Sequence, residues 1–199
     1  MNRSAYCALA LGLVVWAGPA FAQAAFQFAA PNVQLPASPD VSGMRLSFLY
    51  GENRSQRGFD LGLLSLSETS RFSGFALIAG VSRVTGEMSD GAVFSLMNWH
   101  SGHDSGMNGA FINLLDDAGG AFNLGFVTVA AGATMVDFGG FNMSRESTAQ
   151  IGFVNVTDEI KGFQFGFLNI AKNGFLPIFP VFNFPKHRAT ESRKAGAGG

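Results

Sequence analysis

The segment 161–172, near the C-terminus, alternates phenylalanine with small or polar residues in the manner of a β-strand. Its sequence is KGFQFGFLNIAK. Side chains of an extended chain point alternately to opposite faces. The three phenylalanines therefore share one face, and Gln164 and Gly166 share the other. The residues from Asn169 onward read as the end of the strand and a short polar turn.

The same strand and turn recur upstream, so the chain reads as one repeated unit. Glycine occupies the same slot at positions 125, 139, 152 and 166, which gives spacings of 14, 13 and 14 residues. Looser units precede these, and together they make about nine units between Met44 and Phe184. The looser units are 44–50, 59–65, 75–79, 92–98 and 110–114. Self-similarity at a nearly fixed period is typical of stacked repeat architectures.

This pattern predicts an all-β repeat protein, a parallel β-solenoid of about nine units of about 12–18 residues each. The motif always runs in the same sense, with Gly before Asn, and parallel stacking explains that constancy directly. We expect columns of Phe, Leu and Ile to fill the interior. We expect Gly and Gln/Asp columns outside, with a ladder of Asn side chains at a corner.

Antiparallel pairing is the alternative, and it would give a small up-and-down outer-membrane β-barrel. In that arrangement the phenylalanines would face lipid, and Gln150, Gln164 and Asp137 would face the lumen. Two observations weigh against it. The apolar runs are short, and only Tyr50 and Trp99 are available in the repeat body for the aromatic girdles of such barrels.

Four regions are predicted along the chain. Residues 1–22 have the three parts of a secretory signal peptide and end in an Ala-Phe-Ala cleavage site. Residues 23–40 form a Pro/Ala-rich linker. Residues 41–185 form the β-repeat domain, closed by a Pro/Phe-rich C-terminal cap. Residues 186–199 are expected to be a disordered tail.

The best units also resemble a known family of exported bacterial proteins with short surface repeats, whose unit reads approximately Gly-Leu-Gln-Ile-Gly-Leu-Val-Asn. The matching segments are 162–169 and 149–155, and the closing segment 171–184 is similar to the usual ending of that family. The resemblance covers most of residues 44–184. It implies an exported or surface protein without an established activity, and it carries over no catalytic residue. The units in 72–115 depart from the family pattern.

One cluster has the content of a metal site. His100, His103 and Asp104 lie within five residues and could together bind zinc or copper. An exposed turn with Gly102 as its pivot is the favoured interpretation, because no distant ligand is identifiable. The acidic pairs 116–117 and 158–159 are likewise interpreted as turn residues that aid solubility. No catalytic, cofactor-binding or metal-binding residue is therefore assigned.

Charge and cysteine content narrow the function further. Cys7 is the only cysteine and leaves with the predicted signal peptide, so no disulfide is expected. Without Arg3, twelve basic and fourteen acidic residues give a net charge of −2, which argues against nucleic acid as a partner.

We expect an exported, non-enzymatic β-repeat protein of the bacterial periplasm, outer membrane or cell surface, with a structural or interaction role. Its partner would be an envelope protein, a glycan or another copy, with association with the outer membrane as a further expectation. A small pore is the alternative. A glycan-acting or metal-dependent enzyme using Asp116, Asp117 or His100 is the least favoured class.

Overall fold

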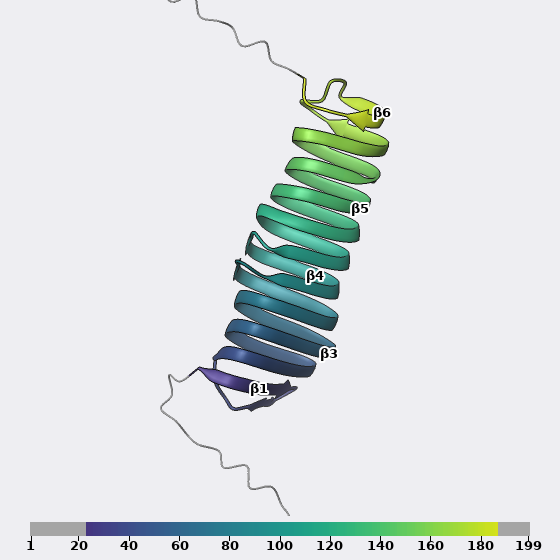
Figure 1. Ribbon diagram of the computed structural model, residues 1–199. Helices are drawn as coiled ribbons and strands as arrows, with labels where there is room; N and C mark the ends of the chain where they lie inside the picture. Colours follow the sequence, from purple (N-terminus) through teal and green to yellow (C-terminus); the bar gives the residue numbers. More distant parts are fainter. Residues whose placement is uncertain (1–22, 187–199) are drawn as a thin grey trace, which may run out of the picture.

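The computed structural model describes residues 23–186, which form a β-solenoid whose coils stack along one axis (Figure 1). The long strands wind through several coils each. They are β3 (Asp40–Met88), β4 (Ala92–Asp104) and β5 (Met107–Ala171). Two shorter strands lie at one end and one at the other: β1 (Ala24–Ala30), β2 (Val33–Leu35) and β6 (Ile178–Asn183). In this part of the chain no helix is long and apolar enough to cross a membrane.

Successive coils are parallel, which confirms the predicted fold class. Strand β3 pairs in parallel with β4, and β4 pairs in parallel with β5. Phe26 lies opposite Met44, and Asn142 lies beside Asn155, so a coil takes between 18 and 13 residues. The up-and-down barrel alternative is contradicted, because it requires neighbouring strands that run in opposite directions.

Antiparallel strands close both ends of the stack. Strand β2 pairs antiparallel with β1, and β6 pairs antiparallel with the last coil of β5. The expected linker at 23–40 thus contains two strands that belong to the solenoid. The Pro/Phe-rich segment expected to be a cap contains β6. The predicted signal peptide and residues 187–199 of the predicted tail lie outside the described residues.

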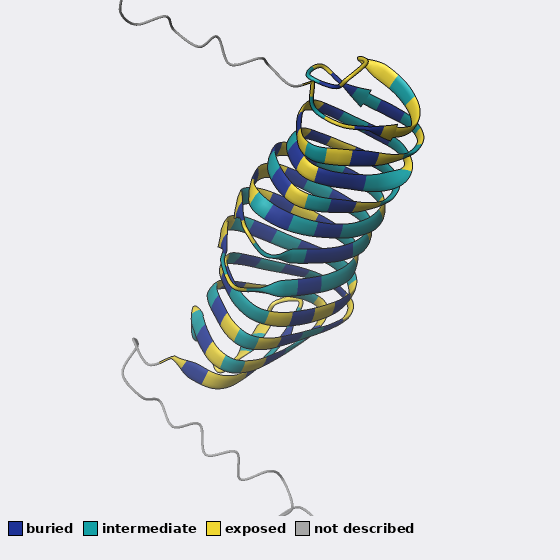
Figure 2. Ribbon diagram, turned by 45° about the horizontal axis from the view of Figure 1, so that its top comes forward, coloured by how far each residue is buried: buried dark blue, intermediate teal, exposed yellow. Residues whose placement is uncertain are grey.

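The prediction of which side chains face inward was wrong. Phe163, Phe165 and Phe167 are 36%, 51% and 70% exposed, whereas Gln164 between them is fully buried. Buried and exposed residues alternate along the coils (Figure 2). The Gln, Asp and Asn columns therefore point inward and the phenylalanines point outward.

Side-chain hydrogen bonds explain this inversion. When the same amide recurs in every coil, it lies one inter-strand distance, about 4.8 Å, from the next, so each can donate to its neighbour. Burial of a polar group costs little once it is hydrogen-bonded. The next inward-pointing position, two residues after each of these amides or the aspartate, holds glycine at positions 125, 139, 152 and 166. The resulting narrow interior would be overfilled by phenylalanine rings from facing walls.

The glycine column was also expected outside, and it instead lies against the backbone of the preceding coil. A Cβ atom on Gly125 would lie 2.6 Å from the Ala110 carbonyl oxygen. The same close approach to the coil before recurs at Gly139, Gly152 and Gly166. These positions therefore require glycine because neighbouring backbones touch there.

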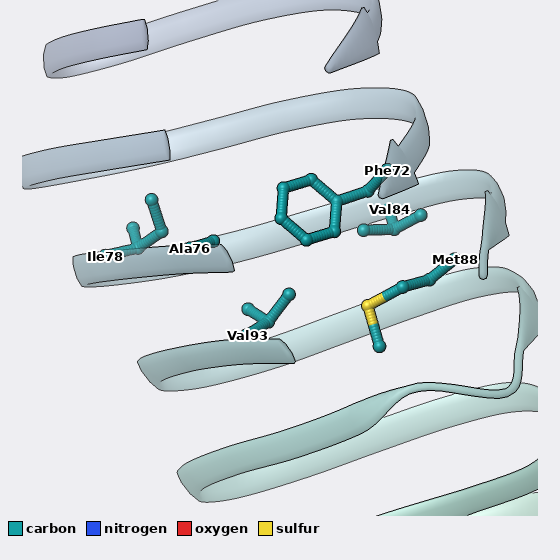
Figure 3. Close-up of a cluster of buried hydrophobic side chains, with 6 residues drawn as sticks. All are labelled: Phe72, Ala76, Ile78, Val84, Met88 and Val93. Atoms are coloured by element: carbon teal, nitrogen blue, oxygen red, sulfur yellow. The ribbon is translucent and has the colours of Figure 1, made fainter. Parts of the chain in front are cut away.

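Two clusters of buried apolar side chains lie in the interior of the described coils. The larger cluster lies where β3 meets β4 and is shown in Figure 3; its members are Phe72, Ala76, Ile78, Val84, Met88 and Val93. The smaller one lies within β5 and comprises Leu115, Ala118, Ala121 and Ala130. The first cluster lies in residues 72–93, the first part of the 72–115 region in which the sequence repeat is irregular, and amide pairing begins beyond it with Asn98 and Asn113.

The inverted arrangement predicts opposite outcomes for two phenylalanine substitutions. Phe165→Ala is expected to lower the free energy of unfolding by less than about 1 kcal/mol, because the ring is half exposed. Phe72→Ala removes a ring from the larger cluster and is expected to cost about 3–5 kcal/mol. Urea unfolding of the two variants at low protein concentration measures both. Equal losses would contradict the outward orientation of Phe165.

Candidate functional site

One outer face of the solenoid consists of three neighbouring columns of outward-pointing residues, which we call the apolar face. Register between coils and contacts between stacked coils define the columns. The first contains Phe26, Met44, Phe59, Phe75, Ala92, Met107, Phe122, Val136, Ala149 and Phe163. The second contains Phe28, Leu46, Leu61, Leu77, Phe94, Gly109, Leu124, Phe138, Ile151 and Phe165. The third contains Phe48, Leu63, Ala79, Leu96, Phe111, Phe126, Gly140, Phe153 and Phe167.

Aromatic rings stack along the apolar face. The rings of Phe111 and Phe126 are 5.1 Å apart between centroids and nearly parallel, with an interplanar angle of 5°. The rings of Phe153 and Phe167 repeat this at 5.0 Å and 4°. Gly140 fills the slot between these two pairs, and a Cβ there would lie 3.1 Å from the Phe126 ring. The rings of this column therefore stack in two pairs with the Gly140 slot between them.

The apolar face carries no charge among the residues that the structure describes. Every position of the three columns is Phe, Leu, Ile, Val, Met, Ala or Gly. Charged pairs lie in another part of the coils. Examples are Lys172 with Asp158, at 2.7 Å, and Lys161 with Glu146. We call the outer surface away from the three columns, which carries these charged pairs together with exposed apolar residues such as Leu64 and Met135, the charged side.

Behind the apolar face, the inward-pointing slots form a ladder of amides that converges on Asp137. On one side, Asn108 donates to Asn123 at 3.1 Å, and Asn123 donates to one Asp137 oxygen at 2.8 Å. The other side runs through Asn183, Gln164 and Gln150. Asn183 donates to Gln164 at 3.3 Å and Gln164 to Gln150 at 2.8 Å. Gln150 donates to the second Asp137 oxygen at 3.3 Å.

The Asp137 carboxyl is the acceptor on which these donors meet. Thr134 donates to it at 2.7 Å and Ser147 at 3.4 Å. Burial raises the pKa of the Asp137 carboxyl, and the hydrogen bonds that it accepts lower the pKa and oppose this shift. The Asp137 carboxyl therefore fixes the direction in which the amides on either side of it donate their hydrogen bonds.

The predicted asparagine ladder is present, and its side chains point into the interior. Asn98 donates to Asn113 at 2.9 Å. Further along, Asn142 donates to Asn155 at 2.9 Å, and Asn155 donates to Asn169 at 2.8 Å. All five are fully buried. This second ladder runs parallel to the first and supports the same wall from its far edge.

The structure does not bring the suspected metal ligands together. His100 and Asp104 are fully buried, and His100 Nδ1 lies 2.5 Å from Asp104 Oδ2. His103 points outward instead, with Nδ1 at 3.1 Å from Asp117 Oδ2 of the next coil. Within residues 23–186, no group of three His, Cys, Asp or Glu side chains is placed to hold a metal ion. The segment lies in β4 and not in the expected turn.

The acidic pairs that the sequence placed in turns lie on the outside of the solenoid. Asp117 and Asp158 are exposed and pair with His103 and Lys172 from adjacent coils. Both pairs lie within β5, so they are strand residues and not turn residues. Their place on the charged side fits the expected contribution to solubility.

Sequence reasoning missed a buried ion pair at the N-terminal end. Arg45 is fully buried and donates to the carboxylate of Asp60 in the next coil, at 3.0 Å for the Nε donor. Ser67 donates to the same carboxylate at 2.8 Å. The signal was available, because Arg45 and Asp60 occupy the slot that Gln150 and Gln164 take later. Opposite charges in successive units of one slot indicate a stacked pair.

The fold places the chain in the class of β-solenoid repeat proteins. Comparison with known families finds no family model that matches it, and no curated protein or solved structure is found to be similar. Function is therefore argued from the apolar face and the interior ladders alone.

Proposed function

We propose that the protein is an exported, non-enzymatic interaction protein of the bacterial cell envelope, and that it binds its partner through the apolar face. The export step rests on the signal-peptide pattern of residues 1–22. The observation that carries the binding role is the unbroken apolar composition of three adjacent columns.

The size of this surface supports a binding role. Coils about 4.8 Å apart and residues about 3.3 Å apart along a strand give a face of roughly 40 Å by 15 Å, or roughly 600 Å² in projection. The largest contiguous apolar patch on a typical monomer is about 300–600 Å² and is often functional. The apolar face reaches the top of that range before the relief of its rings is counted.

The buried carboxylates support binding over catalysis because each is engaged inside the stack. Asp137 accepts hydrogen bonds from four side chains. Asp60 is held by Arg45, and Asp104 by His100, Asn108 and the Gly106 amide. These groups organise the coils and do not line an open cleft.

Cell fractionation followed by chemical cross-linking tests the proposal. The full chain, expressed in a Gram-negative host, is expected outside the cytosol, where a cross-linker should capture it in a complex, and the variant Phe111→Thr/Phe126→Thr/Phe153→Thr is expected there as a monomer. The distribution between complex and monomer should change at least about tenfold, because each ring withdrawn from an apolar contact loses about 1.5–3 kcal/mol. Threonine retains strand propensity, so circular dichroism should be unchanged.

Matched substitutions outside the three columns provide the control. Ala131→Thr/Met143→Thr alters two exposed residues of β5 that do not belong to the apolar face, and it should leave the distribution as in the wild type. A wild-type protein that stays in the cytosol would overturn export. Identical distributions of the wild type and the triple variant would overturn the role of the face.

A further inference from the structure

We infer that the partner of the apolar face is the same face of a second copy, so that two solenoids pack side by side. This inference rests on the proposed function and identifies the partner that the apolar face binds. Four observations carry it: the chemistry of the face, its regular repeat from coil to coil, its area, and the closed ends of the solenoid.

The chemistry of the face fits a partner that is itself dry and uncharged. A helix or sheet that lies on a lipid surface typically has basic residues at its rim and Trp or Tyr at headgroup level. The chain instead has 21 Phe against two Trp and two Tyr. Tyr50 and Trp99, the members of that group in the described residues, lie outside the three columns. Uncharged stacked rings match an equally apolar protein surface.

The geometry of the face is complementary to itself. Its ridges repeat at the inter-coil spacing of about 4.8 Å over roughly 40 Å, and two β-sheets pack face to face when their side chains interdigitate about 10 Å apart. A partner must carry the same repeat to maintain such contact along the whole length. A second copy has that repeat necessarily, and a two-fold axis places the same residues on both sides.

The area is sufficient for a specific pair. A standard interface buries about 800 Å² on each partner. The projected area of roughly 600 Å² underestimates the accessible area, because exposed rings such as Phe126 and Phe153 stand above the strand plane. Association through the whole face therefore reaches the standard size without any contribution from the charged side.

The ends of the solenoid direct association to its side. An open end of parallel coils would offer a strand edge to another copy. Here β2 and β6 cover the ends as short antiparallel strands, and prolines border or interrupt them at Pro36, Pro177 and Pro180. Proline lacks the backbone donor that an added strand needs. The apolar face is then the surface left for self-association.

Complementary charges placed on the face test the dimer. We consider Phe126→Lys/Phe138→Lys and Phe126→Glu/Phe138→Glu in the protein purified after expression of the full chain. Both rings are exposed, at 60% and 51%, so the substitutions should not unfold the coils. Sedimentation velocity from about 1 to about 100 µM covers the weak end of the affinities that interfaces of this size show.

The wild type is expected to be a dimer in this range. Each charged variant alone should be monomeric, with a dissociation constant raised at least about 100-fold by like charges in one interface. An equimolar mixture of the two variants should form a dimer again. This recovery cannot arise from misfolding, and the control Ala131→Lys/Met143→Lys should remain dimeric.

The inference would be overturned if the wild type were still monomeric at the highest concentration of the range. It would also be overturned if both charged variants remained dimeric. These outcomes differ from failure of the proposed function, which is judged by fractionation and cross-linking. A monomeric wild type that binds phosphatidylethanolamine–phosphatidylglycerol vesicles through the face would identify a lipid partner. That result would overturn the dimer and preserve the interaction role.

Discussion

Gly139→Ala is expected to lower the free energy of unfolding by at least about 3 kcal/mol, the upper part of the range for overpacking. The added Cβ would lie well inside contact distance of the Gly125 carbonyl oxygen of the preceding coil. The obstacle is backbone, so no side-chain rotation can relieve it. Gly139 also contacts the following coil, because a Cβ on Gly152 would meet the Gly139 carbonyl oxygen. Separating these coils strains the ladders on both sides.

Gly120→Ala separates steric contact from backbone conformation. Gly120 has a φ of +97°, and a Cβ there would have no atom within 4 Å. Its substitution should cost about 1–2 kcal/mol for the left-handed conformation alone. Urea unfolding followed by far-UV circular dichroism measures both variants. A Gly139→Ala variant as stable as Gly120→Ala would mean that the coils can move apart without penalty.

Asp137→Ala is expected to cost about 3–5 kcal/mol, as does the removal of one partner from other buried charged networks. The substitution removes the acceptor of the Asn123 amide, while Thr134 and Gln150 each lose one of several acceptors. Each buried donor without a partner costs about 1–3 kcal/mol. Asp137→Asn retains the shape and one acceptor oxygen, so it should cost less. Equal stability of Asp137→Ala and the wild type would show that the ladder does not depend on its central acceptor.

The same carboxyl predicts a dependence of stability on pH. Burial raises the pKa of Asp137 above the ordinary value of 3.8. As the pH rises from 3.8 through the raised pKa, the unfolded chain loses its proton first. The native state then binds more protons, so the contribution of Asp137 to stability falls with rising pH. Asp137→Asn should remove this component.

The comparison of wild type with Asp137→Asn at each pH isolates the effect. Other carboxyls contribute with the opposite sign, such as Asp40, whose pKa is lowered by its hydrogen bond with Arg54 and whose contribution is lost as the pH falls below 3.8. The stability of the wild type minus that of the variant should decrease as the pH rises. A difference that stays constant with pH would contradict a raised pKa at Asp137.

The repeat in the sequence was sufficient to predict parallel coils, because glycine and asparagine recur in the same order in the units that contain both. It was not sufficient to predict which side faces inward. Period-two alternation places Phe163 with Phe165 on one side of the strand and Gln164 with Gly166 on the other, but it does not say which side points inward. The phenylalanine side was assigned to the interior because stacked amides such as Gln150 and Gln164 were not expected to satisfy each other's hydrogen bonds there.

The candidate site was hidden for the same reason. Once the phenylalanines were assigned to a core, the outward Gly and Gln/Asp columns were the surface expected to meet a partner. The strands at 24–35 were also missed, because Pro31 and Pro36 favour a linker interpretation. Strand β1 forms there nonetheless, since its register with β3 continues the same columns one coil further, with Phe26 opposite Met44.

The amide column can also be regarded as a one-dimensional chain of dipoles between fixed anions. All amides beside Asp137 donate toward it, while Asn108 also donates to Asp104 at 3.0 Å. Between Asp104 and Asp137 the amides donate toward a carboxylate at each end, so the direction of donation must reverse once. The reversal falls at Asn108, which donates both to Asp104 and to Asn123. Its Oδ1 has no hydrogen-bond partner among the described residues, as such a reversal requires. Extra coils carrying Asn or Gln would add no second reversal, whereas each extra carboxylate would. Column composition thus limits how the solenoid can lengthen by duplication of its coils.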